Sequence, residues 1–97
     1  MALYLRTGKP SKADLIRGIL DYWDPCRKRE SAGYMYYNYE AETIAQTIRK
    51  NSKVSTVAKQ VMKLIDDKLE SEGLEYRVDE ENAFRVAEAM ISAVKRM

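Results

Sequence analysis

The sequence predicts an all-α fold, a compact four-helix bundle-like single domain, and three observations support this prediction. Its 97 residues suffice for one domain and are too few for two of ordinary size. Hydrophobic residues make up 45% of the chain and charged residues 33%, a balance typical of a globular protein. Four segments repeat apolar residues at helical spacing, and such faces must be buried against one another. We therefore expect residues 1–97 to form one helical domain, with residues 1–10 as an N-terminal arm.

The first helix is predicted over residues 12–23. Ser11 suits the N-cap position, and Asp14 follows three residues later, where its carboxylate reaches back to a free amide. Pro25 ends the helix, because the residue before a proline is pushed out of the α region. The apolar face of this helix consists of Leu15, Ile16, Ile19, Leu20 and Trp23.

The second helix is predicted over residues 39–50, with Asn38 as its N-cap and Glu40 and Glu42 in the positive first turn. Its apolar stripe consists of Ala41, Ile44, Ala45 and Ile48. The connection between the first two helices, about 15 residues, is long for a compact bundle. Such a length indicates either a function or a loop with packing of its own.

The third helix has the clearest periodicity, which lasts for about four turns. Its apolar positions are Val54, Val57, Ala58, Val61, Leu64, Ile65 and Leu69. Gly73 suits the left-handed position that follows a helix. Residues 74–78 alternate apolar and polar, and we expect a short extended connector with Leu74, Tyr76 and Val78 on the core.

The fourth helix begins after Asp79, an N-cap followed by Glu80 and Glu81, which favour the positive end of the helix dipole. Its broad apolar face consists of Ala83, Phe84, Val86, Ala87, Met90, Ile91 and Val94. With this fourth helix, the apolar face of each predicted helix has the apolar face of another helix to pack against.

The composition excludes several kinds of chemistry. The sequence has no histidine, so Ser-His-Asp catalysis, Cys-His catalysis and imidazole metal ligation lack their residues. Cys26 is the single cysteine, which excludes an intramolecular disulfide and a cysteine-only zinc site. The net charge of +2 is too weak to require a polyanionic partner. We therefore expect no enzymatic activity, no cofactor and no metal ion.

The same features suggest a compartment. One unpaired cysteine fits a reducing interior, and the N-terminal residues do not have the pattern of an export signal. No stretch approaches the roughly 20 apolar residues that a membrane-spanning helix needs. We expect a cytoplasmic protein that does not bind membranes.

The tripeptide Trp23-Asp24-Pro25 has two interpretations. A tryptophan beside a carboxylate suits a binding pocket. Alternatively, Trp23 extends the apolar face of the first helix into the core, while Asp24 accepts hydrogen bonds from backbone amides in the turn that Pro25 imposes. The burial habits of tryptophan favour the structural interpretation.

The loop after this tripeptide combines basic residues with tyrosines. Arginine and tyrosine often contribute most of the binding energy at protein interfaces. In nucleic-acid complexes, arginine binds phosphates and tyrosine stacks on bases. The predicted partner-binding residues are Arg27, Lys28, Arg29, Tyr34, Tyr36 and Tyr37. In an extended backbone Tyr34 and Tyr36 face one way, and Tyr37 faces the other way and is free to pack inward. A solvated loop with its tyrosines packed on the bundle remains an equal alternative.

Two further sets of residues could in principle carry chemistry, but the sequence favours a structural role for both. Asp66 and Asp67, followed by Glu70 and Glu72, would suit a divalent cation or acid–base chemistry. Lysines at salt-bridging spacing favour a solvated helix face instead. The cations near Cys26 would lower the pKa of its thiol, but without histidine no catalytic role follows.

The order of these pieces resembles a family of short bacterial proteins of unknown function that carry a Trp-Asp-Pro signature. The matching features are Trp23-Asp24-Pro25, the pair Tyr39-Glu40 with Glu42, and the later pairs Val57-Ala58 and Val86-Ala87. The resemblance spans about residues 14–95 and implies a compact helical fold with no assigned activity. The basic loop at 26–33 and the N-terminal arm depart from the family pattern.

The leading functional hypothesis is a small non-enzymatic protein-binding protein, such as an inhibitor, an immunity-type factor or a regulatory adaptor. A nucleic-acid-binding module that uses the basic, tyrosine-rich loop is the alternative. Salt dependence separates them, because phosphate binding weakens steeply with ionic strength. A carboxylate-based metalloenzyme ranks last.

Overall fold

The computed structural model describes residues 10–28 and 36–97, and in these residues it has four α-helices and no strand. The helices are α1 (Lys12–Trp23), α3 (Asn38–Thr47), α4 (Val54–Ser71) and α5 (Glu80–Lys95). They account for 69% of the described residues. The predicted all-α, four-helix fold is confirmed.

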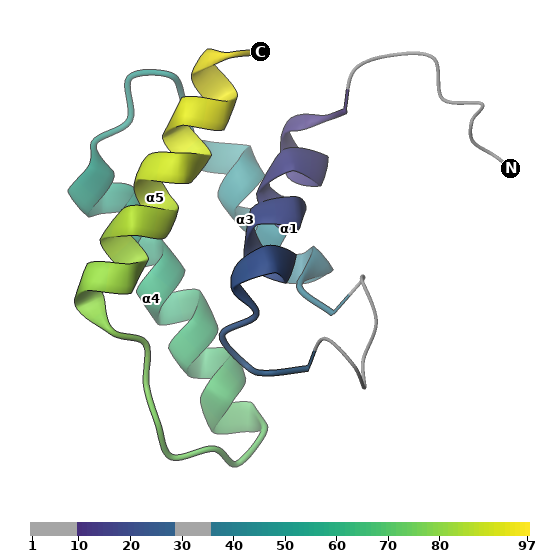
Figure 1. The fold of residues 1–97 in the computed structure, drawn as a ribbon, viewed down its shortest axis with the longest axis vertical. Helices are drawn as coiled ribbons and strands as arrows, with labels where there is room; N and C mark the ends of the chain where they lie inside the picture. The colour runs from purple at the N-terminus through teal and green to yellow at the C-terminus, as the bar shows by residue number, and fades with distance from the viewer. Residues whose placement is uncertain (1–9, 29–35) are drawn as a thin grey trace, which may run out of the picture.

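The four helices form a ring in which each one packs against two others. Helix α1 contacts α3 and α5, and α4 contacts the same two helices from the opposite corner. Figure 1 shows α1 and α5 running in opposite directions on the viewer's side, with α3 and α4 behind them. The outer side of the α1–α5 pair therefore has no third layer of described helix over it.

The predicted caps at three helix ends are confirmed. Ser11 and Asp14 form a reciprocal capping box at the start of α1, and Asp79 accepts a hydrogen bond from the amide of Asn82 at the start of α5. Gly73 adopts a left-handed conformation (φ 75°) after α4. The amide of Leu74 then donates to the Leu69 carbonyl at 2.9 Å, which completes a Schellman motif.

Helix α3 differs from the prediction at both ends. It starts at Asn38, one residue earlier than expected, and Asn38 is not the cap but accepts a hydrogen bond from Arg17. It ends at Thr47, because Ile48 is extended and directs its carbonyl oxygen to side chains. Lys12 Nζ and the Arg49 guanidinium each donate to that oxygen at 3.0 Å. The contact from Lys12 is tertiary, and α3 ends three residues before the predicted end at residue 50.

The core lies at the centre of the ring and contains most of the predicted apolar positions. Its larger buried side chains are Ile16, Leu20, Ile44, Ile48, Val61, Ile65, Leu69 and Met90. Three predicted core residues lie further out than expected. Trp23 is only partly buried at the edge of the core, while Phe84 on α5 and Tyr76 in the connector are 36% and 38% exposed. The extended connector keeps Leu74 and Val78 inward, as predicted.

Candidate functional site around Trp23

The tripeptide at the end of α1 forms a tight turn. Asp24 takes a left-handed conformation (φ 50°), and its amide donates to the carbonyl of Leu20 at 2.7 Å. Its carboxylate Oδ1 accepts from the amide of Lys28 at 2.9 Å, and Arg27 is left-handed as well (φ 58°). The predicted turn role of Asp24 is confirmed. Two non-glycine residues in this conformation store backbone strain, a feature that clusters at functional sites.

Tyr37 is part of the core and links this turn to the start of α3. Only 2% of the residue is exposed. Its hydroxyl donates to Asp24 Oδ1 at 2.7 Å and accepts from the amide of Cys26 at 2.9 Å. Burial raises the pKa of the Tyr37 hydroxyl well above its usual range. Tyr37 therefore packs inward, a position that does not fit its predicted role in partner contact.

Tyr36 and Lys28 bind the end of α4. The Tyr36 hydroxyl donates to Glu72 Oε2 at 2.7 Å, and Lys28 Nζ lies 3.5 Å from Glu72 Oε1. The hydrogen bond from Tyr36 holds the pKa of the Glu72 carboxyl below its usual range, and Lys28 acts in the same direction. The Tyr36 ring meets Tyr37 edge-on at 5.0 Å and lies beneath Lys68 Nζ at 4.2 Å. Both residues serve the internal packing of the loop.

A buried ion pair lies next to these tyrosines. Lys68 Nζ donates to Glu40 Oε2 at 3.2 Å, and only 6% of the Glu40 side chain is exposed. The other carboxylate oxygen, Glu40 Oε1, has no hydrogen-bond partner among the described residues. The position of Glu40 in the first turn of α3 predicts an interaction only with the dipole of its own helix. Nothing in the sequence indicates its ion pair with Lys68 on α4.

Cys26 lies in the core and not among the cations of the loop. It is 2% exposed and forms no disulfide. Burial raises the pKa of its thiol, so the expected lowering by nearby cations is wrong. A buried protonated thiol packs in the core as a small apolar side chain does.

Arg27 points away from this network and contributes to a polar pocket. Its guanidinium carbon lies 5.1 Å from the centre of the Tyr76 ring, in a cation–π contact. The pocket has a volume of about 270 Å³ and is lined by Trp23, Asp24, Arg27, Tyr76, Arg77 and Asp79, among others. Arg77 Nη1 is held in place by the carbonyls of Leu74 and Tyr76, each at 2.9 Å. The site therefore combines two aromatic rings with two fixed guanidinium groups.

On its other side Trp23 lines an apolar hollow between α1 and α5. This hollow has a volume of about 250 Å³, and its walls are Ile19, Tyr22, Trp23, Arg85, Val86 and Ala89, with Asn82 at the end shared with the polar pocket. Tyr22 at its rim is 86% exposed. Trp23 therefore lines both the polar pocket and the apolar hollow, and the binding-pocket interpretation stays a prediction.

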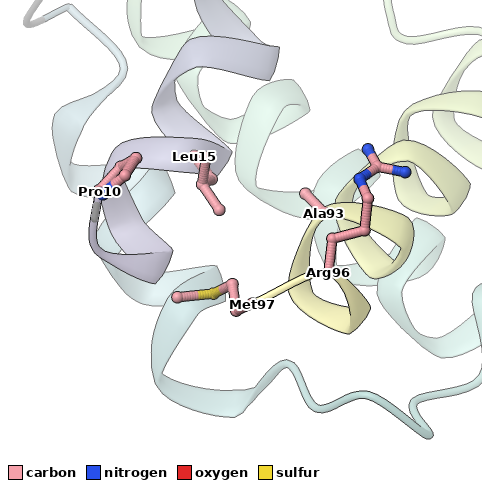
Figure 2. A pocket seen from close by; sticks show the side chains of 5 residues that line it. All are labelled: Pro10, Leu15, Ala93, Arg96 and Met97. Carbon is pink, nitrogen blue, oxygen red and sulfur yellow. The ribbon is translucent and has the colours of Figure 1, made fainter.

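A second apolar hollow, of about 240 Å³, lies at the opposite end of the α1–α5 seam. Figure 2 shows Leu15 of α1 facing Ala93 and Met97 at the end of α5, with Pro10 and Arg96 at the edges. No sequence pattern marked these hollows, because both helices present apolar residues there as they do toward the core.

Of the six predicted partner-binding residues, the four that the structure describes do not form one surface. Arg27 lines the polar pocket, whereas Lys28, Tyr36 and Tyr37 make the internal contacts described above. Arg29 and Tyr34 lie outside the described residues.

The neighbouring acidic residues Asp66 and Asp67 of α4 have different contacts. Asp67 pairs with Lys63 at 3.3 Å on the exposed face, as the solvated-face interpretation predicts. Asp66 instead accepts a hydrogen bond from the amide of Val78 at 2.9 Å and so holds the connector in place. Among the described residues, no group of three acidic or cysteine side chains is arranged to hold a metal ion.

Comparisons with protein-family models, with curated proteins and with solved structures found no match to this chain. The resemblance to the Trp-Asp-Pro family stays a prediction. In residues 10–28 and 36–97, none of the helices has the length and apolar character to cross a membrane.

Proposed function

We propose that this chain is a small non-enzymatic protein-binding protein, of the inhibitor, immunity-type or adaptor kind. The observation that carries the proposal is the surface around Trp23, where a polar pocket and an apolar hollow share one wall. We call this surface the Trp23 face and define it by Tyr22, Trp23, Arg27, Tyr76, Arg77 and Arg85. Tryptophan, tyrosine and arginine are the residues that most often dominate binding energy at protein interfaces.

Two further observations favour binding over catalysis. The sequence has no histidine to act as a general base. Its single thiol, Cys26, is buried and its pKa is raised, so it is a poor nucleophile. A cytoplasmic location and membership of the Trp-Asp-Pro family are consistent with this proposal and form part of it.

Nucleic-acid binding is the alternative, because Trp23, Tyr76 and the two arginines of the polar pocket also suit stacked bases and phosphates. Asp24 and Asp79 line the same pocket, and their charges oppose a polyanion. The net charge of +2 is also far from that of a strongly basic nucleic-acid-binding domain. These charges favour a protein partner.

Affinity capture from the source cell, with nuclease-treated lysate, tests the proposal. The wild type is compared with a Tyr76→Ala/Arg77→Ala variant of the Trp23 face and with a matched Lys63→Ala/Asp67→Ala variant on the exposed face of α4. We expect a protein partner that the wild type and the α4 variant retain and the Trp23-face variant loses. Captured material that disappears on nuclease treatment, or that falls steeply with salt, would favour the nucleic-acid alternative.

A further inference from the structure

The two apolar hollows of the α1–α5 seam are placed so that one elongated ligand would fill both. The first is walled by Ile19, Val86 and Ala89, and the second by Leu15 and Ala93 among others. Val86 and Ala93 are seven residues apart on α5, which corresponds to about 10 Å along a helix axis. Two apolar side chains at positions i and i+7 of a bound helix have the same separation.

The charges along this groove favour an acidic ligand. Arg96 borders the second hollow, and Arg27 and Arg77 lie in the polar pocket beyond Trp23. None of these three arginines forms an ion pair within the part of the chain that the structure describes. Asp24 and Asp79 line the same polar pocket and offset the charges of Arg27 and Arg77, whereas the two apolar hollows are lined by Arg85 and Arg96 and by no described Asp or Glu. Arg85 pairs with Glu81, whereas Arg96 forms no ion pair among the described residues, so Arg96 is the cation of the groove that would meet a carboxylate of the ligand.

Gly18 on α1 has no internal reason to be glycine. It is exposed, its backbone does not have a positive φ, and an added Cβ would meet nothing within 4 Å. A glycine inside a helix costs about 0.5–1 kcal/mol relative to alanine. Gly18 lies about one helical turn from both Leu15 and Tyr22, which line the two hollows, so helix geometry places it on the same side of α1. The missing side chain there lets another backbone approach α1 closely.

We propose that the α1–α5 groove binds an acidic amphipathic helix of a partner protein. Apolar side chains two turns apart enter the two hollows, the helix backbone passes over Gly18, and a carboxylate faces Arg96. A helix fits because the groove lies between two antiparallel helices, and the described residues offer no strand edge for an extended peptide. The inference rests on the proposed function, for which it names the class of partner.

The test is selection from a phage-displayed library of random peptides about 16 residues long, enough for four helical turns. We expect the selected peptides to carry apolar residues at i and i+7, with Asp and Glu between them. The affinities of the selected peptides are then measured by fluorescence anisotropy, for the wild type and for variants of this protein whose helical content has been checked. Gly18→Ala should weaken binding and Gly18→Gln should weaken it further, by about tenfold or more, whereas the control change Lys63→Ala on the exposed face of α4 should alter it by less than about threefold. Arg96→Glu should also weaken binding and reduce its salt dependence.

Three results would overturn the groove inference while the proposed function stands. Selected peptides would bind Gly18→Gln as tightly as the wild type, or would be rich in Lys and Arg. A dimer of the wild type, seen by light scattering and dissociated by Gly18→Gln, would show that a second copy of the chain occupies the groove. If the library yields no binder while single-stranded RNA binds with a steep salt dependence, both the inference and the proposed function are wrong.

Discussion

Two clusters of aromatic residues flank the turn after α1, and they differ in what surrounds their polar atoms. Tyr36 and Tyr37 each donate a 2.7 Å hydrogen bond to a carboxylate, on Glu72 and Asp24, and both rings pack on the core. Tyr22 and Tyr76, on the Trp23 face, are 86% and 38% exposed. A tyrosine becomes a structural residue where the fold supplies a carboxylate at its hydroxyl and apolar neighbours for its ring. A tyrosine whose ring lacks such apolar neighbours remains more exposed.

The largest difference between the two clusters should appear on truncation. Tyr37→Ala removes a buried ring and the hydroxyl that bonds both the Asp24 carboxylate and the Cys26 amide. We expect it to lower the free energy of unfolding by about 3–5 kcal/mol. Tyr76→Ala, the matched change on the Trp23 face, should cost about 1 kcal/mol or less. Urea unfolding followed by circular dichroism measures both, and equal losses would abolish the distinction.

The buried ion pair beside Tyr36 should be next in effect. Lys68→Met removes the only cation that Glu40 contacts among the residues the structure describes, and it should cost about 3 kcal/mol. The double change Lys68→Met/Glu40→Gln removes the buried charge as well and should recover part of that loss. Thermal unfolding of the single and double variants checks this, and a double variant less stable than Lys68→Met would contradict it.

Trp23 belongs to both comparisons, because it packs on the core with one side and lines the two pockets with the other. Trp23→Ala should therefore cost about 1–3 kcal/mol, less than the about 3–5 kcal/mol of a fully buried aromatic residue. Trp23→Phe should retain most of the stability and lose partner affinity. Unfolding and binding measurements on the same two variants separate the roles, and full binding by Trp23→Phe would place the partner elsewhere.

The smallest expected effect is a dependence on alkaline pH. Burial raises the pKa of the Tyr36 and Tyr37 hydroxyls above their usual value near 10. The folded state therefore binds these protons more tightly than the unfolded state. The stability they contribute is fully present below about pH 10 and is lost as pH rises through their folded pKa values.

Ultraviolet absorbance of tyrosinate, recorded beside circular dichroism, tests this. The Tyr36 and Tyr37 hydroxyls should ionise only as helix is lost, and Tyr37→Phe should remove one tyrosine from that late phase. Ionisation of every tyrosine near pH 10 with the helices intact would contradict the burial of their hydroxyls.

The local features of the fold were accessible from the sequence because they depend on neighbours in the chain. The capping box at Ser11, the N-cap at Asp79 and the left-handed Gly73 all follow from backbone groups within a few residues. The early end of α3 was not accessible, because Lys12 reaches the Ile48 carbonyl from the start of α1. Helix type is a local property, whereas helix length was decided here by a tertiary contact.

The candidate site shows the same division. The sequence by itself determined that the loop after α1 is rich in arginine and tyrosine, and that catalysis by histidine is impossible. Only the tertiary structure decided that Tyr36 and Tyr37 turn inward to Glu72 and Asp24, and that Arg27 meets Tyr76 and Arg77 beside Trp23. The physical reason is that a polar side chain takes the position in which its hydrogen bonds are satisfied. Its partners come from segments distant in sequence, and the packing of the helices sets their distance.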